Sequence, residues 1–190
     1  MSLKTEPESK GGSAITARGL KLAICTIIAE VGTIKTVYNG EEKEMPKVYF
    51  EFQLINGEKI GKLFTFSFYD KAQLAKSLIG WTGSTEFEKD LTYYIGKKVV
   101  LSLVEAKQGD KTYVNIDSFN NFETSELKDN DFTGVECFCF DYEDESTYKN
   151  LSKIPMYIFK KMETTKEYEK FRQNKLEVPE PQEQTEDLPF

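Results

Sequence analysis

Tyrosine and lysine residues occur in pairs along the extended segments of this chain, and they are the residues best suited to binding chemistry. The pairs are Lys47 with Tyr49, Lys62 with Tyr69, and Lys111 with Tyr113. Single-stranded nucleic acids bind proteins by stacking bases on aromatic rings while cations hold the phosphate backbone. The pattern therefore predicts a nucleic-acid interface, although each residue alone would fit a solvated strand face or a barrel end equally well.

Aromatic residues are abundant enough to build both a core and such an interface. Phe, Tyr and Trp together make up 13% of the chain. Trp81 is a further stacking candidate, but its position on the apolar face of a predicted helix favours the core. Four phenylalanines that alternate along two predicted strands are assigned to the core: Phe50, Phe52, Phe64 and Phe66.

Residues needed for common enzyme chemistry are missing. The chain has no His, which excludes Ser-His-Asp catalysis and His-containing zinc sites. Its three cysteines, Cys25, Cys137 and Cys139, are too few for a four-ligand zinc site and are expected to be reduced structural thiols. No phosphate-binding glycine motif or hydrolase motif occurs. We expect a protein that is not an enzyme and that needs no cofactor or metal.

The acidic run Asp141–Glu145 leaves one enzymatic alternative, a metal-dependent nuclease. Two-metal chemistry requires several carboxylates that converge on one point. Adjacent carboxylates in a loop-like segment would splay apart, so a solvated linker is the favoured interpretation.

Charge is distributed unevenly along the chain. The net charge of −7 arises from residues 123–190, which hold nine basic and seventeen acidic residues, whereas residues 19–122 hold thirteen of each. Local potential, and not the sum over the chain, governs binding. We predict a flexible N-terminal arm (1–18), a domain (19–122), a C-terminal extension with short helices (123–176) and a disordered acidic tail (177–190).

Hydrophobic periodicity predicts five strands in the domain. They are Leu20–Lys35, Lys47–Ile55, Lys62–Tyr69, Lys97–Ala106 and Lys111–Phe119. In the second strand Val48 to Leu54 alternate inward, with Lys47 and Tyr49 outward. In the third strand Phe64, Phe66 and Phe68 are predicted inward. Asn39-Gly40 and Asn56-Gly57 predict tight turns, and Gly32 predicts a bulge.

The pattern changes to a helical one after the third strand. Asp70 is the predicted N-cap of a helix that buries Leu74, Leu78 and Trp81. A second short helix is predicted at Thr85–Ile95. A helix between strands three and four is the order of a five-stranded OB-fold barrel, so a mainly β OB fold is expected. An SH3-like barrel and a β-sandwich are the alternatives.

The extension is predicted to hold two short helices. Pro155 would occupy the first position of one. The sequence Thr164-x-x-Glu167 predicts a capping box that opens the other, which would run through Phe171.

The domain resembles a family of bacteriophage OB-fold proteins that bind single-stranded DNA. The resemblance rests on Lys47–Phe52, Phe64–Leu78, Trp81-x-Gly83 and Lys97–Phe119. It implies a role in phage replication or recombination. The turn Phe68-Tyr69-Asp70 departs from relatives, which often place a more polar or basic group there.

The end of the sequence resembles the acidic tip of bacterial single-stranded DNA-binding proteins. The residues are Glu186, Asp187, Leu188, Pro189 and Phe190. An apolar anchor beside carboxylates would suit a hydrophobic pocket rimmed by basic residues on a partner protein.

These observations predict a protein that coats single-stranded DNA and recruits replication or recombination proteins through this tip. The alternative is an OB-fold interaction module that does not bind DNA. No membrane span or secretory signal is evident, so a cytoplasmic location is expected, that of the host if the protein is phage-encoded. A homo-oligomer is compatible with the sequence.

Overall fold

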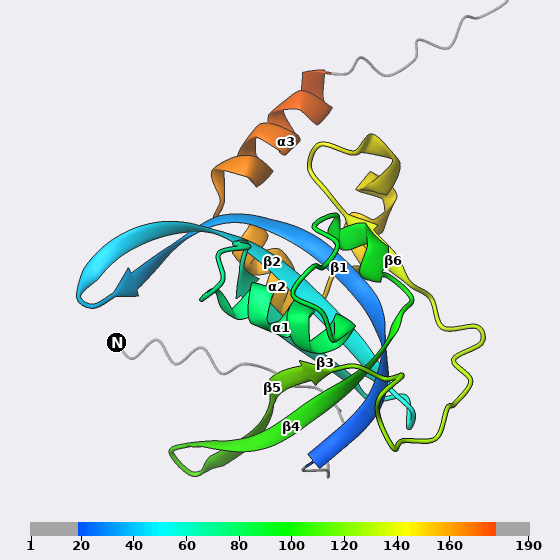
Figure 1. Ribbon diagram of the computed structural model, residues 1–190. Helices are drawn as coiled ribbons and strands as arrows, with labels where there is room; N and C mark the ends of the chain where they lie inside the picture. The colour runs from blue at the N-terminus through cyan, green and yellow to red at the C-terminus, as the bar shows by residue number, and fades with distance from the viewer. Residues whose placement is uncertain (1–18, 178–190) are drawn as a thin grey trace, which may run out of the picture.

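The computed structural model describes residues 19–177, which form a mainly β protein with a helical extension (Figure 1). The strands are β1 (Gly19–Tyr38), β2 (Glu41–Leu54), β3 (Lys59–Thr65), β4 (Lys98–Gln108), β5 (Lys111–Asn120) and β6 (Phe138–Phe140). Five strands pair antiparallel in the order β3-β2-β1-β4-β5, and β6 pairs parallel with β1. The predicted mainly β class is confirmed.

Alternation along β2 places its even-numbered apolar residues in the core. Val48, Phe50, Phe52 and Leu54 are all buried, as predicted. They pack with Phe64 of β3, with α1 (Gln73–Thr82) and with the inner faces of β4 and β5. The predicted inner face of this sheet is therefore confirmed for β2.

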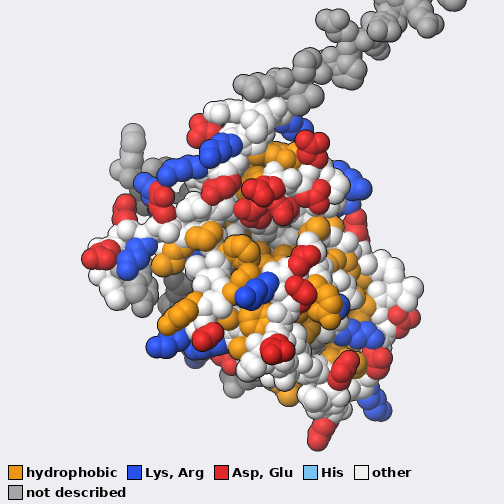
Figure 2. All heavy atoms as spheres, turned by 45° about the horizontal axis from the view of Figure 1, so that its top comes forward, with side chains coloured by type: hydrophobic (Ala, Val, Ile, Leu, Met, Phe, Trp, Pro, Cys, Tyr) orange, Lys and Arg blue, Asp and Glu red, His pale blue; other side chains and the backbone are white. Residues whose placement is uncertain are grey.

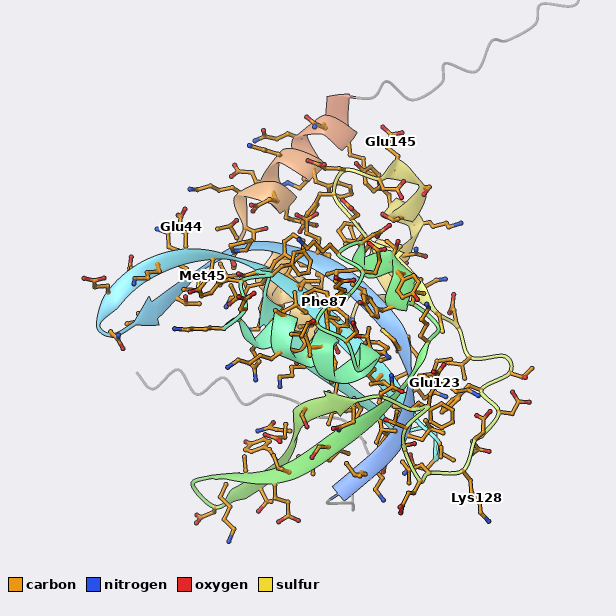
Figure 3. The ribbon with its side chains drawn as sticks, viewed as in Figure 1. Glu44, Met45, Phe87, Glu123, Lys128 and Glu145 are labelled. Atoms are coloured by element: carbon orange, nitrogen blue, oxygen red, sulfur yellow. The ribbon has the colours of Figure 1, made fainter. Side chains whose placement is uncertain are left out.

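The β1–β2 hairpin is longer than predicted. Asn39 and Gly40 both have positive φ and make the predicted tight turn, but pairing continues from Tyr38↔Glu41 down through the charged residues that follow. The resulting two-stranded arm carries Glu44 and Met45 (Figure 3). The second strand was predicted to begin at Lys47, whereas the turn sets a register in which β2 already pairs with β1 from Glu41 onward. The predicted irregularity at Gly32 is confirmed by a register shift between Glu30 and Gly32.

β3 and β5 form the two ends of the sheet and do not pair as strands. The seam between them is bridged by side chains: the Lys62 ammonium donates to the carbonyls of Ile116 (2.7 Å) and Asp117 (3.4 Å) of β5. The rings of Phe64 and Phe119 also meet, with centroids 5.7 Å apart. Backbone pairing therefore leaves the sheet open at this seam.

The helix α1 buries the predicted face, with Leu74, Leu78 and Trp81 in the core. Its predicted cap was wrong. The helix begins after Ala72, which has no side-chain cap, because the Ala72 N–H donates to the carbonyl of Tyr69 and closes a turn over Asp70. At Gly80 a Cβ atom would lie 2.2 Å from the Phe119 carbonyl oxygen, so α1 packs directly on the backbone of β5.

The helix predicted at Thr85–Ile95 was wrong. The structure has turns there, followed by the short 3-10 helix η1 (Leu91–Tyr94), which the Asp90 carboxylate caps by accepting from the Thr92 N–H (3.0 Å). Phe87 packs inward beside α1 (Figure 3). The apolar residues thus reach the core from an irregular segment.

The extension packs on the outer face of the sheet. It contains β6, η2 (Glu145–Lys153), α2 (Met156–Met162) and α3 (Lys166–Glu177). Ile154, Ile158 and Met162 form a second apolar cluster with the outward residues of β1 and β2, among them Ile27 and Tyr49. Both faces are consequently buried in the central parts of these two strands, from Leu22 to Ala29 of β1 and from Val48 to Phe52 of β2.

Two helix-start predictions need correction. Pro155 is the N-cap of α2 and Met156 is its first residue. The predicted capping box was wrong: the Tyr168 N–H donates to Thr165 Oγ1 (3.2 Å), and Glu167 instead accepts from Thr33 on β1. No helix within residues 19–177 is long and apolar enough to cross a membrane.

Candidate functional site

Tyr49 is buried, which corrects its predicted place on a solvated face. Only 1% of its surface is exposed because α2 covers the outer face of β2. Its hydroxyl lies 2.5 Å from the hydroxyl of Tyr157, and its ring lies over Gly61, where a Cβ atom would clash. Sequence alternation identified the outward face correctly but gave no sign that a distant segment covers it.

A buried polar cluster surrounds the Tyr49 hydroxyl. Glu51 accepts from Thr26 (3.3 Å) and from Tyr49 (3.3 Å), and it pairs with the Lys59 ammonium (3.2 Å). Burial raises the pKa of Tyr49, and the nearby Tyr157 and Glu51 raise it further. The phenol therefore stays neutral and serves as a hydrogen-bonding group.

Two of the predicted lysines already have partners. Lys47 is half-buried and donates to Thr65 Oγ1 (2.8 Å), while Lys62 donates across the seam to β5. Burial lowers the pKa of both ammonium groups. Lys62 therefore has a structural role that the strand pattern could not reveal.

Tyr69 and Tyr113 are exposed as predicted, with 66% and 43% of their surfaces accessible. Tyr69 follows β3, and Tyr113 lies opposite Ala106 on the β4–β5 hairpin. Lys111 begins β5, and its side chain lies outside the described part of the chain. The tip residues Glu186, Asp187, Leu188, Pro189 and Phe190 also lie outside the described residues.

Phe66 was wrongly predicted to be in the core. β3 ends at Thr65, and 45% of the Phe66 surface is exposed. Its ring contacts that of Phe68 (5.3 Å between centroids), which in turn meets Phe87 (6.0 Å). The third strand therefore supplies an exposed aromatic ring that period-two alternation had placed inside.

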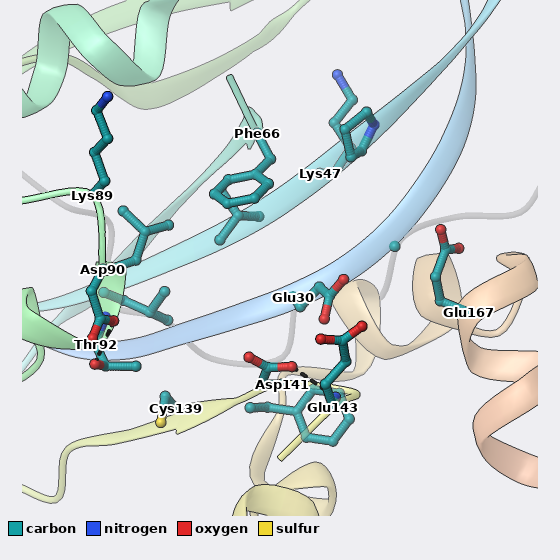
Figure 4. A pocket seen from close by; sticks show the side chains of 16 residues that line it. Glu30, Lys47, Phe66, Lys89, Asp90, Thr92, Cys139, Asp141, Glu143 and Glu167 are labelled. Carbon is teal, nitrogen blue, oxygen red and sulfur yellow. Dashed lines mark hydrogen bonds between the residues drawn. The ribbon is translucent and has the colours of Figure 1, made fainter. Parts of the chain in front are cut away.

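A cleft of about 370 Å³ lies beside Phe66, and we call it the acidic cleft (Figure 4). Lys89, Phe66 and Lys47 line one side of it. Four carboxylates lie across the cleft, Glu30, Asp141, Glu143 and Glu167, and a fifth, Asp90, lies next to Lys89. In the space-filling view, acidic side chains gather next to an apolar surface (Figure 2).

The carboxylates of the acidic cleft differ in their environments. Burial raises the pKa of Glu30, and the neighbouring charges of Asp141 and Glu167 raise it further against a hydrogen bond from the Tyr142 N–H. Burial also acts to raise the pKa of Glu167, but hydrogen bonds from Thr33 outweigh it and lower that pKa. Such a wall repels phosphate groups.

Asp141 and Asp144 of the acidic run cap local turns. Asp141 accepts from the Glu143 N–H (2.8 Å), and Asp144 accepts from the Ser146 N–H (3.0 Å) at the start of η2. Among residues 19–177 no cluster of three or more His, Cys, Asp or Glu side chains is arranged to hold a metal ion.

A second cleft, of about 400 Å³, lies at the end of α1, and we call it the aromatic cleft. Its lining is dominated by four aromatic residues, Trp81, Tyr93, Tyr94 and Phe122. Trp81 is buried, and its indole N–H donates to the Lys98 carbonyl (2.8 Å). This agrees with the core position that the sequence favoured. The small part of the Trp81 surface that remains accessible lines the aromatic cleft.

Two lysines lie over rings of the aromatic cleft. The Lys97 ammonium is 2.9 Å from the Tyr93 ring centroid, and the Lys98 ammonium is 5.7 Å from that of Phe122. Lys98 also pairs with Asp129. Sequence reasoning missed Tyr93, Lys97 and Phe122; the adjacent pairs Tyr93-Tyr94 and Lys97-Lys98 were the available signal.

No protein-family model matches the chain, and no curated protein matches it.

Proposed function

We propose that this protein binds single-stranded DNA through exposed aromatic rings on an OB-type barrel. The order β3-β2-β1-β4-β5, with α1 inserted between β3 and β4, is the circular strand order of an OB fold opened between β3 and β5. The contacts of Lys62 and Phe64 across the seam support the same arrangement.

The observation that carries the function is a set of exposed aromatic rings, one of which, Tyr93, lies under the Lys97 ammonium. On the domain these rings are Tyr69, Tyr93 and Tyr113, together with Phe66, which borders the acidic cleft and is not assigned to the DNA path. Soluble proteins bury most large aromatic side chains, because removing their large apolar surface from water is favourable. Exposed rings combined with cations are the elements that bind single strands without a sequence code.

The DNA path must differ from the one that the strand pattern predicted. The outer face of β2 lies under α2, and the acidic cleft repels phosphates. The β1–β2 and β4–β5 hairpins project toward the same side of the sheet (Figure 1). We place the strand along this side, where Tyr113 lies on one hairpin and Tyr69 follows β3.

In this function the protein coats DNA during replication or recombination, in the cytoplasm of a host cell if it is phage-encoded, without catalysing a reaction. The tip Glu186–Phe190 would recruit partner proteins. The alternative remains an interaction module that does not contact DNA.

Titration with a fluorescent dT oligomer at two salt concentrations tests the proposal. We expect affinity to fall as salt rises, by about 0.7 log units per log unit of salt for each phosphate neutralised. Tyr69→Ala and Tyr113→Ala should each weaken binding by about 1–3 kcal/mol if each ring stacks one base.

Ile55→Ala is the matched control, because Ile55 is exposed on the β2–β3 turn and is not aromatic. Absence of any binding to the oligomer at low salt would refute the function. Equal losses for Ile55→Ala and for the two tyrosine variants would refute the role of the rings.

A further inference from the structure

We infer that the aromatic cleft binds one nucleobase of a single strand, with Lys97 on the adjoining phosphate. This inference rests on the proposed function and adds a site that lies away from both the strand faces and the hairpins. The cleft is formed by the end of α1, by η1, by the start of β4 and by the residues that follow β5.

The lining of the cleft matches the flat, apolar surface of a base. Trp81 and Tyr94 pack with ring centroids 4.9 Å apart, and Tyr93 meets Tyr94 edge-on at 5.2 Å. Tyr94 is fixed by donating its hydroxyl to the Glu88 carbonyl (3.0 Å). Tyr93, by contrast, is 52% exposed, so its ring is free to stack on a base beside the fixed rings of Trp81 and Tyr94.

The charges at the cleft point to a phosphate. Lys98 is paired with Asp129, but no described carboxylate lies within ion-pair distance of Lys97. The Lys97 ammonium rests over the Tyr93 ring, and its four-carbon stem allows it to move from that ring to a phosphate oxygen. Tyr93 would then stack on one base while Lys97 neutralises the phosphate of the same nucleotide or of its neighbour.

Size also agrees with a single base. A volume of about 400 Å³ is near the lower end of the range for small-molecule pockets, which suits a small ligand such as one base. Glu123 is the one carboxylate among the described lining residues, in contrast to the five of the acidic cleft. The aromatic cleft is therefore the better of the two for an anionic, planar ligand.

Intrinsic fluorescence of full-length protein tests the site directly, because Trp81 is the only tryptophan in the sequence. We expect a dT oligomer to change Trp81 emission saturably. Tyr93→Ala should lower the affinity reported by that signal at least fivefold. Lys97→Gln should lower it and reduce its salt dependence, and Ile55→Ala should leave both unchanged.

Melting temperatures identify any variant that fails to fold. If Tyr93→Ala fails to fold, Lys97→Gln still tests the site. Oligomer binding in the fluorescent-oligomer titration without any change in Trp81 emission would overturn this site while leaving the proposed function intact. Free dTMP, added at the same nucleotide concentration, separates the two sources of a base. Saturation by dTMP with equal affinity would overturn the assignment to a single strand.

Discussion

Tyr49 combines a large buried ring with a hydroxyl that must be satisfied away from water. The ring fills the space above Gly61, and the hydroxyl meets Tyr157 of α2 and Glu51 of its own strand. Buried polar groups are costly when a partner is lost. This residue therefore holds the extension to the sheet through both packing and hydrogen bonding.

Tyr49→Ala should destabilise the protein by about 3–5 kcal/mol, because it leaves a cavity under α2. Tyr49→Phe should cost about 1–3 kcal/mol, since it keeps the ring but removes a donor to the buried Glu51 carboxylate as well as the contact with the Tyr157 hydroxyl. The exposed Tyr69→Ala should change stability by no more than about 0.5 kcal/mol. Urea unfolding measures all three, and equal midpoints for Tyr49→Ala and Tyr69→Ala would contradict the burial of Tyr49.

At the scale of elements, α3 meets β1 at a glycine. Gly32 has a φ of 96°, and a Cβ atom there would lie 2.7 Å from Thr165 Oγ1 and 2.9 Å from Glu167 Oε2. Glu167 in turn accepts from the Thr33 N–H (3.0 Å) and from its hydroxyl (2.6 Å). The start of α3 can therefore pack this closely on β1 only because the bulge has a glycine, and Glu167 in turn satisfies the Thr33 N–H beside that bulge.

Gly32→Ala should destabilise the protein more than Gly57→Ala does. Gly57 also has positive φ, at 85°, but a Cβ atom there would have no neighbour within 4 Å, so its substitution adds backbone strain alone, about 1–3 kcal/mol. Gly32→Ala causes the same backbone strain, and its Cβ atom would in addition push away Thr165 and Glu167 at the start of α3. Thermal unfolding of both variants provides the comparison, and a Gly57→Ala loss as large as that of Gly32→Ala would argue against the contact.

Local patterns predicted the elements that local physics controls. The turn at Asn39-Gly40, the inner face of β2 and the buried face of α1 follow from side-chain period and glycine conformations. The helix at Thr85–Ile95 failed because apolar spacing does not distinguish a helix from an irregular segment that buries the same residues. The three-residue β6 was missed because it is too short to show a period.

The candidate site was harder to predict than the fold because exposure depends on distant segments. Tyr49 and Phe66 exchanged their predicted places: the extension covers the first, and the early end of β3 exposes the second. Tyr69 and Tyr113 were placed correctly because nothing in residues 19–177 packs over them. Lys62 has its partners across a seam that strand order alone does not describe.

For the whole molecule, β1 and β2 form a shared wall between two apolar clusters. One cluster lies inside the sheet around Phe50 and Phe52, and the other lies under the extension around Ile27 and Ile158. A strand buried on both faces reads as a nearly continuous apolar run, as the buried residues from Leu22 to Ala29 do apart from Thr26. The extension is thus an integral part of the folded protein.

The open seam between β3 and β5 has a consequence for motion. Backbone hydrogen bonds resist opening everywhere along β1, whereas β3 and β5 meet through the Lys62 ammonium and packed rings. Local opening of low free energy should therefore begin at this seam, where α1 contacts both β3 and β5.

Hydrogen–deuterium exchange should show faster amide exchange at the seam-facing edges of β3 and β5 than in the middle of β1. The Lys62→Met substitution should make exchange at the seam faster still. Uniform protection across the three strands would mean that the side-chain bridge holds the two ends of the sheet together as firmly as a strand pair.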